Sequence, residues 1–183
     1  RLGEGEAYLL LTHDFPGNSW LADFLTPFIR RLANEVPSRV RLEDPSGDVY
    51  YTHREEETRV TRIHLLNTDW TEAGNWRLCS LWLDGVEVPL IIREGRLSEV
   101  IWFDSLAILV QDEGIYVEEV SSSTSGYSLR LHGSQRGEIL LRTLNGKPFE
   151  EISFEGRNLE TTEGEGWMVA NIDFKDRSIG ELI

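Results

Sequence analysis

Short apolar runs separated by polar turn residues fill the chain from Val49 onward. Residues 59–120 hold the clearest series, in which runs rich in leucine, β-branched and aromatic residues each end in Gly, Asn, Asp or Ser. This pattern is typical of successive strands joined by tight turns. Within residues 76–83 the pattern has period two, so Ser80 and Trp82 fall on one face and Leu81 on the other. The stretch therefore predicts a sheet with two distinguishable sides.

Turn signals punctuate the same region. Asp84-Gly85, Glu94-Gly95 and Asn145-Gly146 predict hairpin turns, because glycine reaches positive φ without a Cβ clash. The polar residues 121–126 predict a linker or an exposed turn. No helix is predicted after Val49, and regularly spaced strand and turn signals predict an antiparallel β-sandwich.

Residues 1–45 follow a different pattern. The continuous apolar run at residues 7–12 is typical of a strand covered on both faces. Apolar side chains then follow helical spacing up to Leu32, behind a predicted N-cap at Ser19. Pro27 either opens a second helix or kinks a single one. Residues 39–42 predict another strand, which completes a short β-α-β unit.

The chain is thus predicted to be mainly β, with two parts. Residues 1–45 are the β-α-β unit, which we interpret as the tail of an α/β domain, and residues 46–183 are the β-sandwich. The turn-rich residues 43–48 mark the boundary. Strands around Trp82 and Trp102 are apolar on both faces, so both faces must be covered. We expect the opposing sheet on one side and residues 7–42 on the other, with both tryptophans in the interior.

Composition limits the partners. The chain of 183 residues has 32 acidic and 18 basic side chains and a net charge of −14. Such a surface repels phosphate backbones and anionic headgroups, so neither nucleic acid nor membrane is an expected partner. No apolar run approaches the ~20 residues of a membrane-spanning helix. The chain begins at Arg1, which leaves room for an upstream region, and the compartment stays unknown.

Cysteine and histidine usage predicts no metal site. Cys79 is the single cysteine, and its apolar neighbours indicate a buried small hydrophobe rather than a reactive thiol. No set of Cys and His residues has metal-ligand spacing, so neither a metal nor a cofactor is expected. His64 and His132 are isolated within predicted strands and are interpreted as structural.

Two kinds of residue are candidates for catalysis. His13 and Asp14 follow an apolar strand and precede a helix, where open α/β sheets bind ligands, and they would act as base and orienting group. The favoured interpretation is that Asp14 and Asn18 cap the turn and the helix. A glycosidase needs two carboxylates that face each other across one sugar. The candidate carboxylates of this chain occur at predicted strand ends, where Asp favours turn geometry. These are Asp69, Asp84 and Asp104.

Tryptophans offer a binding chemistry. Trp70 and Trp76 flank residues 71–75 and are the pair expected to be exposed, where aromatic rings can stack on sugar rings. Packing against the protein is the favoured interpretation of this pair, and a saccharide platform is the alternative.

Three segments carry a resemblance to a known family: YLLLTHDFPGNSWLADFLTPFIRRL at residues 8–32, LLNTDW at residues 65–70 and REG at residues 93–95. They resemble the C-terminal part of large bacterial carbohydrate-active enzymes of the β-galactosidase and lacto-N-biose phosphorylase type. In that family a catalytic barrel precedes an amidotransferase-like α/β domain and a β-sandwich. The resemblance implies the end of the α/β domain plus the sandwich. It assigns no catalytic residue, because the family's catalytic carboxylates lie in the barrel.

The leading expectation is a non-catalytic accessory region of a glycoside hydrolase or phosphorylase. It would pack on an upstream catalytic domain of the same parent chain or on a neighbouring subunit. The alternative is a carbohydrate-binding module that holds an oligosaccharide on exposed aromatics. Its candidate ligand-binding residues are Trp70, Trp76, His13 and Asp14. An independent enzyme that acts through His13 and Asp14 ranks third.

Overall fold

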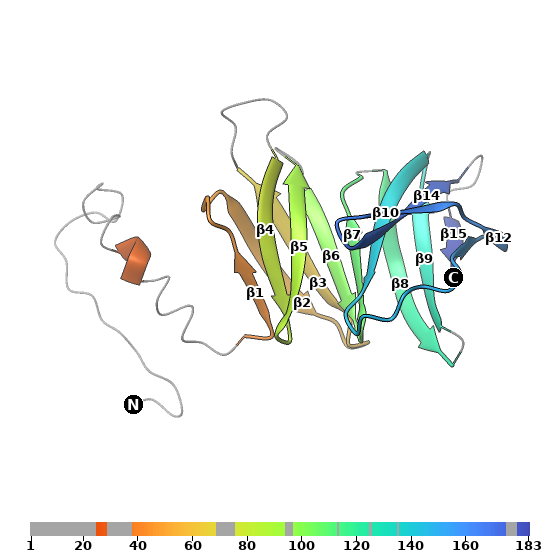
Figure 1. Ribbon diagram of the computed structural model, residues 1–183, viewed down its shortest axis with the longest axis horizontal. Coiled ribbons are helices and arrows are strands. Elements are labelled where there is room, and N and C mark those ends of the chain that lie inside the picture. The colour runs from red at the N-terminus through yellow and green to blue at the C-terminus, as the bar shows by residue number, and fades with distance from the viewer. Residues whose placement is uncertain are drawn as a thin grey trace. The chain divides into compact units, whose positions relative to one another are not determined.

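The computed structural model describes residues 25–28, 38–68, 76–93, 97–112, 114–124, 126–134, 136–174 and 179–183 (Figure 1). Contacts divide the chain into two units, residues 1–38 and 39–183. In the first unit, residues 25–28 form one helical turn that contains Pro27. The predicted strand at residues 7–12 and the predicted cap at Ser19 lie outside the described residues.

Antiparallel strands build the second unit, which confirms the predicted β-sandwich. The described strands are β1 (Val40–Glu43), β2 (Val49–Glu55), β3 (Thr61–Asn67), β4 (Trp76–Leu83), β5 (Val86–Arg93), β6 (Leu97–Phe103), β7 (Leu106–Val110), β8 (Ile115–Ser123), β9 (Gly126–Gly133), β10 (Arg136–Thr143), β11 (Ser153–Phe154), β12 (Arg157–Asn158), β13 (Thr161–Gly164), β14 (Trp167–Asp173) and β15 (Ile179–Leu182). They form a three-stranded sheet β1-β4-β5, a seven-stranded sheet β13-β14-β10-β7-β6-β3-β2, and a five-stranded sheet β12-β11-β15-β9-β8.

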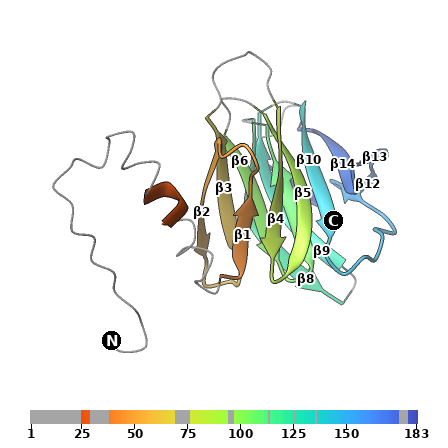
Figure 2. The same ribbon diagram turned by 60° about the vertical axis from the view of Figure 1, so that its left-hand side comes forward.

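The seven-stranded sheet is the middle layer of three (Figures 1 and 2). In β6, Val100 and Trp102 belong to a hydrophobic cluster shared with β4 and β5. Ile101 and Phe103 alternate with them and belong to a second cluster shared with β8 and β9. Strands that are apolar on both faces are therefore covered on both faces, as the alternation of β6 predicts.

The second cover differs from the expected one. Of residues 7–42, which were expected to supply it, the structure places 40–42 there, in β1. The other strands of this cover, β4 and β5, come from the middle of the chain. The face of β4 that carries Cys79 and Leu81 is apolar. It needs burial, which the middle sheet provides.

The turn-rich residues 43–48 connect β1 to β2 within the second unit. The carboxylate of Asp44 accepts hydrogen bonds from the backbone N–H groups of Ser46 (3.0 Å) and Val49 (2.8 Å) and so closes the turn. β1 pairs with β4, which ties it to the sandwich. The second unit, as contacts define it, begins at Arg39.

The turn predictions have mixed outcomes. Asp84-Gly85, with φ values of 46° and 82°, joins β4 to β5 as predicted. Residues 121–126 are not a linker, because β8 and β9 pair as far as Ser123 and Gly126, and the exposed turn at Thr124 agrees with the other predicted alternative. Asn145-Gly146 ends β10 without forming a hairpin, since the Asn145 side chain accepts a hydrogen bond from Lys147 N (3.0 Å) and the chain leaves the sheet. Glu94-Gly95 lies outside the described residues.

Side chains of the middle sheet close the free edge of β5. The indole N–H of Trp167 donates to the carbonyl of Pro89 (2.9 Å), and the amide N–H of Gln111 donates to the carbonyl of Ile91. Pro89 has no backbone N–H, which an edge strand tolerates. The three-stranded sheet is thus held to the middle sheet by directed hydrogen bonds as well as by apolar packing.

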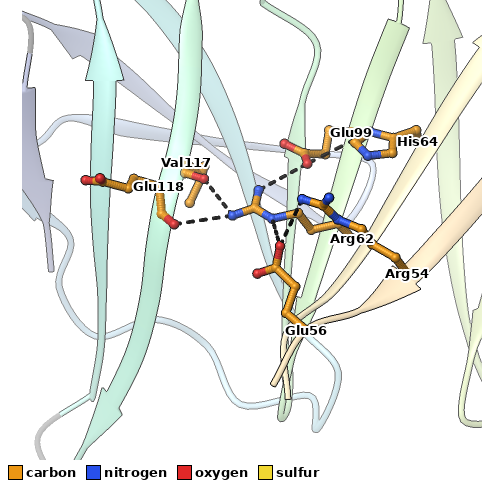
Figure 3. Close-up of polar contacts among 7 residues, drawn as sticks. All are labelled: Arg54, Glu56, Arg62, His64, Glu99, Val117 and Glu118. Carbon is orange, nitrogen blue, oxygen red and sulfur yellow. Dashed lines mark hydrogen bonds and ion pairs between the residues drawn. The ribbon is translucent and has the colours of Figure 1, made fainter. Parts of the chain in front are cut away.

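Arg62 joins β8, the edge of the five-stranded sheet, to the middle sheet (Figure 3). Its side chain is 3% exposed and contacts Glu56 (3.0 Å) and Glu99 (3.1 Å). It also donates to the carbonyls of Val117 (2.8 Å) and Glu118 (3.4 Å), where β8 bulges. Burial disfavours the charged guanidinium, but the hydrogen bond and charge of Glu99, with the charge of Glu56, outweigh it and raise the pKa of Arg62. The buried arginine therefore stays charged.

Candidate functional site

The three-stranded sheet covers only part of one face of the middle sheet. The hydrophobic cluster between the two sheets takes its middle-sheet side chains mainly from β2, β3, β6 and β7. On the same sheet, Glu138 of β10 and Asn171 of β14 are exposed. Next to β5, this uncovered part forms a groove of about 660 Å³. The groove is lined by Arg93, Gln111, Asp112, Arg136, Gly137, Glu138, Leu140, Asn171, Ile172 and Asp173.

Strand alternation brings polar groups together in the groove. β10 pairs with β14 so that Glu138 lies opposite Asn171, and Arg136 lies opposite Asp173. The Arg136 guanidinium contacts the Asp173 carboxylate at 2.9 Å. Leu140 is partly buried and packs against the cluster below, which gives the groove an apolar patch. The combination of amide, carboxylate and apolar surface suits a ligand that has both hydroxyl groups and C–H faces.

The end of β7 shapes the neighbouring part of the groove. Because the amide N–H of Gln111 donates to β5, its carbonyl oxygen remains as an acceptor. Asp112 accepts a hydrogen bond from Gly114 N at 2.9 Å. Its other carboxylate oxygen would lie 2.6 Å from a Cβ placed on Gly137. A glycine at this position therefore lets the Asp112 carboxylate lie against β10.

Arg93 lines the groove, and Trp76 contacts Arg93 on the outer face of the three-stranded sheet. They are opposite each other in β4 and β5, and the guanidinium carbon lies 4.8 Å from the centroid of the indole ring. This cation–π contact restrains a ring that is 52% exposed. The Nε of Arg93 is buried and has no hydrogen-bond partner among the described residues. Arg93 thus connects an exposed aromatic ring to the groove that it lines.

Of the predicted ligand-binding residues, the structure describes Trp76, at the start of β4. Trp70, His13 and Asp14 lie outside the described residues. Trp76 is exposed, which is what a saccharide platform requires and what the favoured packing interpretation did not expect.

The prediction that Trp82 and Trp102 are both interior is wrong for Trp82. Trp102 is 6% exposed and belongs to the cluster between the sheets. Trp82 is half-buried on the outer face of β4, with the Arg41 guanidinium 5.2 Å from its ring centroid. The reason is alternation: Trp82 shares its face with Ser80, and Leu81 and Leu83 take the core side.

Other residues considered from the sequence have structural roles. Asp84 and Asp104 stand in turns with positive φ, and Asp84 forms a two-point contact with Arg39 (2.9 and 2.8 Å). Burial raises the pKa of Cys79 to about 12, so the thiol is inert at neutral pH. Within the described ranges, no group of three or more potential ligands could hold a metal ion. In the same ranges, no helix has the length and apolarity to cross a bilayer.

The sequence interpretation missed most of the groove. Arg93, Gln111, Glu138 and Asn171 were not singled out, although Glu138 and Asn171 alternate with buried Ile139, Ala170 and Ile172. That alternation indicates a strand face without a cover. Locating the groove also required the order of strands in the sheets, which joins residues from distant parts of the chain.

Comparisons of the chain with protein-family models, with curated proteins and with solved structures find no match. The groove and the contact between Arg93 and Trp76 are therefore the features from which a function can be inferred.

Proposed function

We propose that the β-sandwich is a non-catalytic module that binds an oligosaccharide in the groove beside Trp76, as an accessory region of a carbohydrate-active enzyme. The observation that carries the proposal is an exposed tryptophan in contact with Arg93, which lines a groove that contains amide and carboxylate side chains. An aromatic ring packs on the C–H face of a sugar, and amides and carboxylates hydrogen-bond its hydroxyls. Arg93, which contacts Trp76 and lines the groove, connects the two kinds of group.

Each side chain has a defined role in this proposal. Trp76 stacks on a sugar ring, held in place by Arg93. Glu138 accepts hydrogen bonds from hydroxyls, Asn171 both donates and accepts, and Gln111 offers its carbonyl oxygen. Because polar groups in such sites fix the orientation of the ligand, they supply the selectivity and Trp76 supplies much of the affinity.

The state of the carboxylates supports binding rather than hydrolysis. Glycoside hydrolysis needs two carboxyl groups that face one glycosidic bond. In the groove, Asp173 is paired with Arg136, and Asp112 accepts a backbone hydrogen bond. Glu138 is the carboxylate of this set that has no partner among the described residues. One carboxylate is sufficient for recognition but not for the two-carboxylate mechanism.

The parent enzyme is proposed from the resemblance of residues 8–32, 65–70 and 93–95. The expected partner is a catalytic domain upstream in the same parent chain, or a neighbouring subunit. A module that holds the saccharide near that domain raises the local concentration of substrate there. This role needs only moderate affinity from the groove itself.

A structural role is the second candidate, and one observation favours it. Leu78, on the outer face of β4, is 67% exposed, and it lies between Trp76 and the half-buried Trp82 on the same face. An apolar sheet face of this kind is a surface on which another domain can pack. In this reading Trp76 contacts protein instead of sugar.

Calorimetric titration of residues 39–183 and of the full chain with a panel of oligosaccharides tests the proposal. We expect one binding site, and Trp76→Ala should weaken binding by about tenfold or more, which is about 1.4 kcal/mol. Tyr50→Ala is the matched control, because Tyr50 is a 66% exposed aromatic on β2, far along the middle sheet from β10 and β14. If no oligosaccharide binds, or if the two variants behave alike, the groove is not a saccharide site. Release of new reducing ends that Glu138→Gln abolishes would contradict the non-catalytic role.

A further inference from the structure

We infer that the groove takes an oligosaccharide that carries a carboxylate, a uronic-acid unit, and that Arg93 binds this carboxylate. The inference rests on the proposed function and specifies the class of its ligand. It starts from the guanidinium of Arg93, which the stacking role alone does not explain.

Arg93 differs from most arginines of the sandwich. Seven others contact a carboxylate: Arg39, Arg41, Arg54, Arg62, Arg77, Arg130 and Arg136. In a chain with 32 acidic and 18 basic side chains, carboxylate partners are abundant. Arg93 nevertheless has no carboxylate contact among the described residues, and its Nε is buried without a hydrogen-bond partner there. The Nε has too little accessible surface for a ligand to reach it, so the donors for a ligand are the terminal N–H groups of Arg93, which are not among the buried unpartnered atoms.

The guanidinium of Arg93 suits a carboxylate. Its carbon lies 4.8 Å from the centroid of the Trp76 ring, and the N–H donors of a guanidinium all lie in its plane. Donors at the edge of the plane match the two oxygens of a carboxylate, which they can bind at two points. A uronic-acid unit has its carboxylate attached to the sugar ring. The ring can therefore contact the exposed part of Trp76 while the carboxylate reaches Arg93.

The charges around the groove favour a ligand with a small negative charge. Arg136 and Asp173 neutralise each other, so Arg93 faces a groove that also holds Asp112 and Glu138. Two nearby carboxylates disfavour a doubly charged phosphate more than a singly charged carboxylate. The net charge of −14 also opposes the approach of long polyanions. A short oligosaccharide with few uronic-acid units meets both conditions.

Three matched ligands test the inference by calorimetry at one pH: a uronic-acid tetramer, its methyl ester, and the neutral hexose tetramer of the same linkage. We expect the acidic tetramer to bind about tenfold or more tightly than its methyl ester, since the ester keeps the shape and removes the charge. Arg93→Gln should abolish this preference. Arg157→Gln is the control, because it makes the same charge change at an exposed arginine on β12. Arg93→Lys keeps the charge but not the planar donors, so it should lose most of the preference.

The outcomes separate the inference from the proposed function. If the acid and its ester bind equally to the unmodified protein, the carboxylate inference is overturned and saccharide binding stands. If none of the three binds while the chain is folded, the proposed function itself fails. Displacement of the tetramer by inorganic phosphate in an Arg93-dependent way would overturn the assignment to uronic acid. Thermal unfolding of each variant shows whether it is folded, and Arg93→Lys carries the test if Arg93→Gln does not fold.

Discussion

The indole nitrogen of Trp167, on the middle sheet, donates a hydrogen bond to the carbonyl oxygen of Pro89, on the edge strand β5, over 2.9 Å. This hydrogen bond joins the middle sheet to the edge of the three-stranded sheet. Trp167 is buried, so its N–H has no access to water if this contact is lost. The contact therefore fixes the distance between β5 and β14 as well as stabilising the fold.

Trp167→Phe should lower the free energy of unfolding by about 1–3 kcal/mol, because it leaves the partly buried Pro89 carbonyl without its donor and removes part of the buried ring. Urea unfolding, followed by circular dichroism, measures the change.

Trp82→Phe is the matched control for this prediction. The Trp82 Nε1 is buried without a hydrogen-bond partner among the described residues, so the substitution removes an unsatisfied donor. Its cost should be clearly smaller than that of Trp167→Phe. Equal costs would show that ring volume, and not the hydrogen bond to Pro89, determines the loss.

Arg62→Met should destabilise the sandwich by about 3–5 kcal/mol, since it leaves Glu99 and the carbonyl of Val117 without their buried partner. Arg54→Met removes an exposed arginine that contacts Glu56, and it should cost less than about 1 kcal/mol. Denaturant titration of the two variants gives the comparison. Similar losses would mean that Arg62 contributes no more than a surface ion pair.

Asp44 predicts a loss of stability in acid. Burial alone would raise its pKa, but the Ser46 hydroxyl and the backbone N–H groups of Val49 and Ser46 outweigh burial and lower the pKa below its ordinary value of 3.8. A carboxyl with a lowered folded pKa stabilises the protein above its unfolded pKa, and this contribution is lost as the pH falls through the folded pKa.

Asp44→Asn should therefore flatten the dependence of unfolding free energy on pH below about pH 4, where the unmodified protein loses stability. Unfolding curves at several pH values from neutral to acid measure it. Glu163→Gln is the control, because it removes an exposed carboxylate on β13 that has no partner among the described residues. An unchanged acid profile in Asp44→Asn would remove Asp44 as a source of the acid sensitivity.

Cys79 should not react with a thiol reagent such as 5,5′-dithiobis(2-nitrobenzoate) at neutral pH in the folded protein. Burial raises its pKa to about 12, and its side chain lies between the three-stranded and middle sheets. In denaturant it should react at the rate of an ordinary thiol. Rapid modification without denaturant would mean that the two sheets separate often in solution.

Local patterns predicted the class of fold because each strand carries its own signal. Period-two alternation in residues 76–83 separates Leu81 from Ser80 and Trp82, and in the structure Leu81 is in the core. The sequence assigns Trp82 to the interior because its strand is apolar on both faces, and this assumed that both faces are covered. Interior position depends on which faces of a sheet are covered, and this follows from the order of the strands rather than from side-chain hydrophobicity.

The candidate site was less accessible to sequence reasoning. Trp76 was identified because it borders a turn-rich stretch, a local property. The groove combines Arg93 with Glu138 and Asn171, which are far apart in the chain and meet only because β5 ends its sheet over β10 and β14. No local pattern encodes that meeting, and the strand order of three sheets is needed to find it.

The contacts that close β5 and β8 have a consequence for the behaviour of the protein in concentrated solution. An unpaired strand edge offers backbone groups that can recruit a strand from another molecule and begin aggregation. On β5, Pro89 has no backbone N–H, and the side chains of Trp167 and Gln111 donate hydrogen bonds to the carbonyls of Pro89 and Ile91. On β8, Arg62 occupies the carbonyl of Val117 and places a charge at the edge. The residues that hold the layers together also keep neighbouring molecules from adding to their edges.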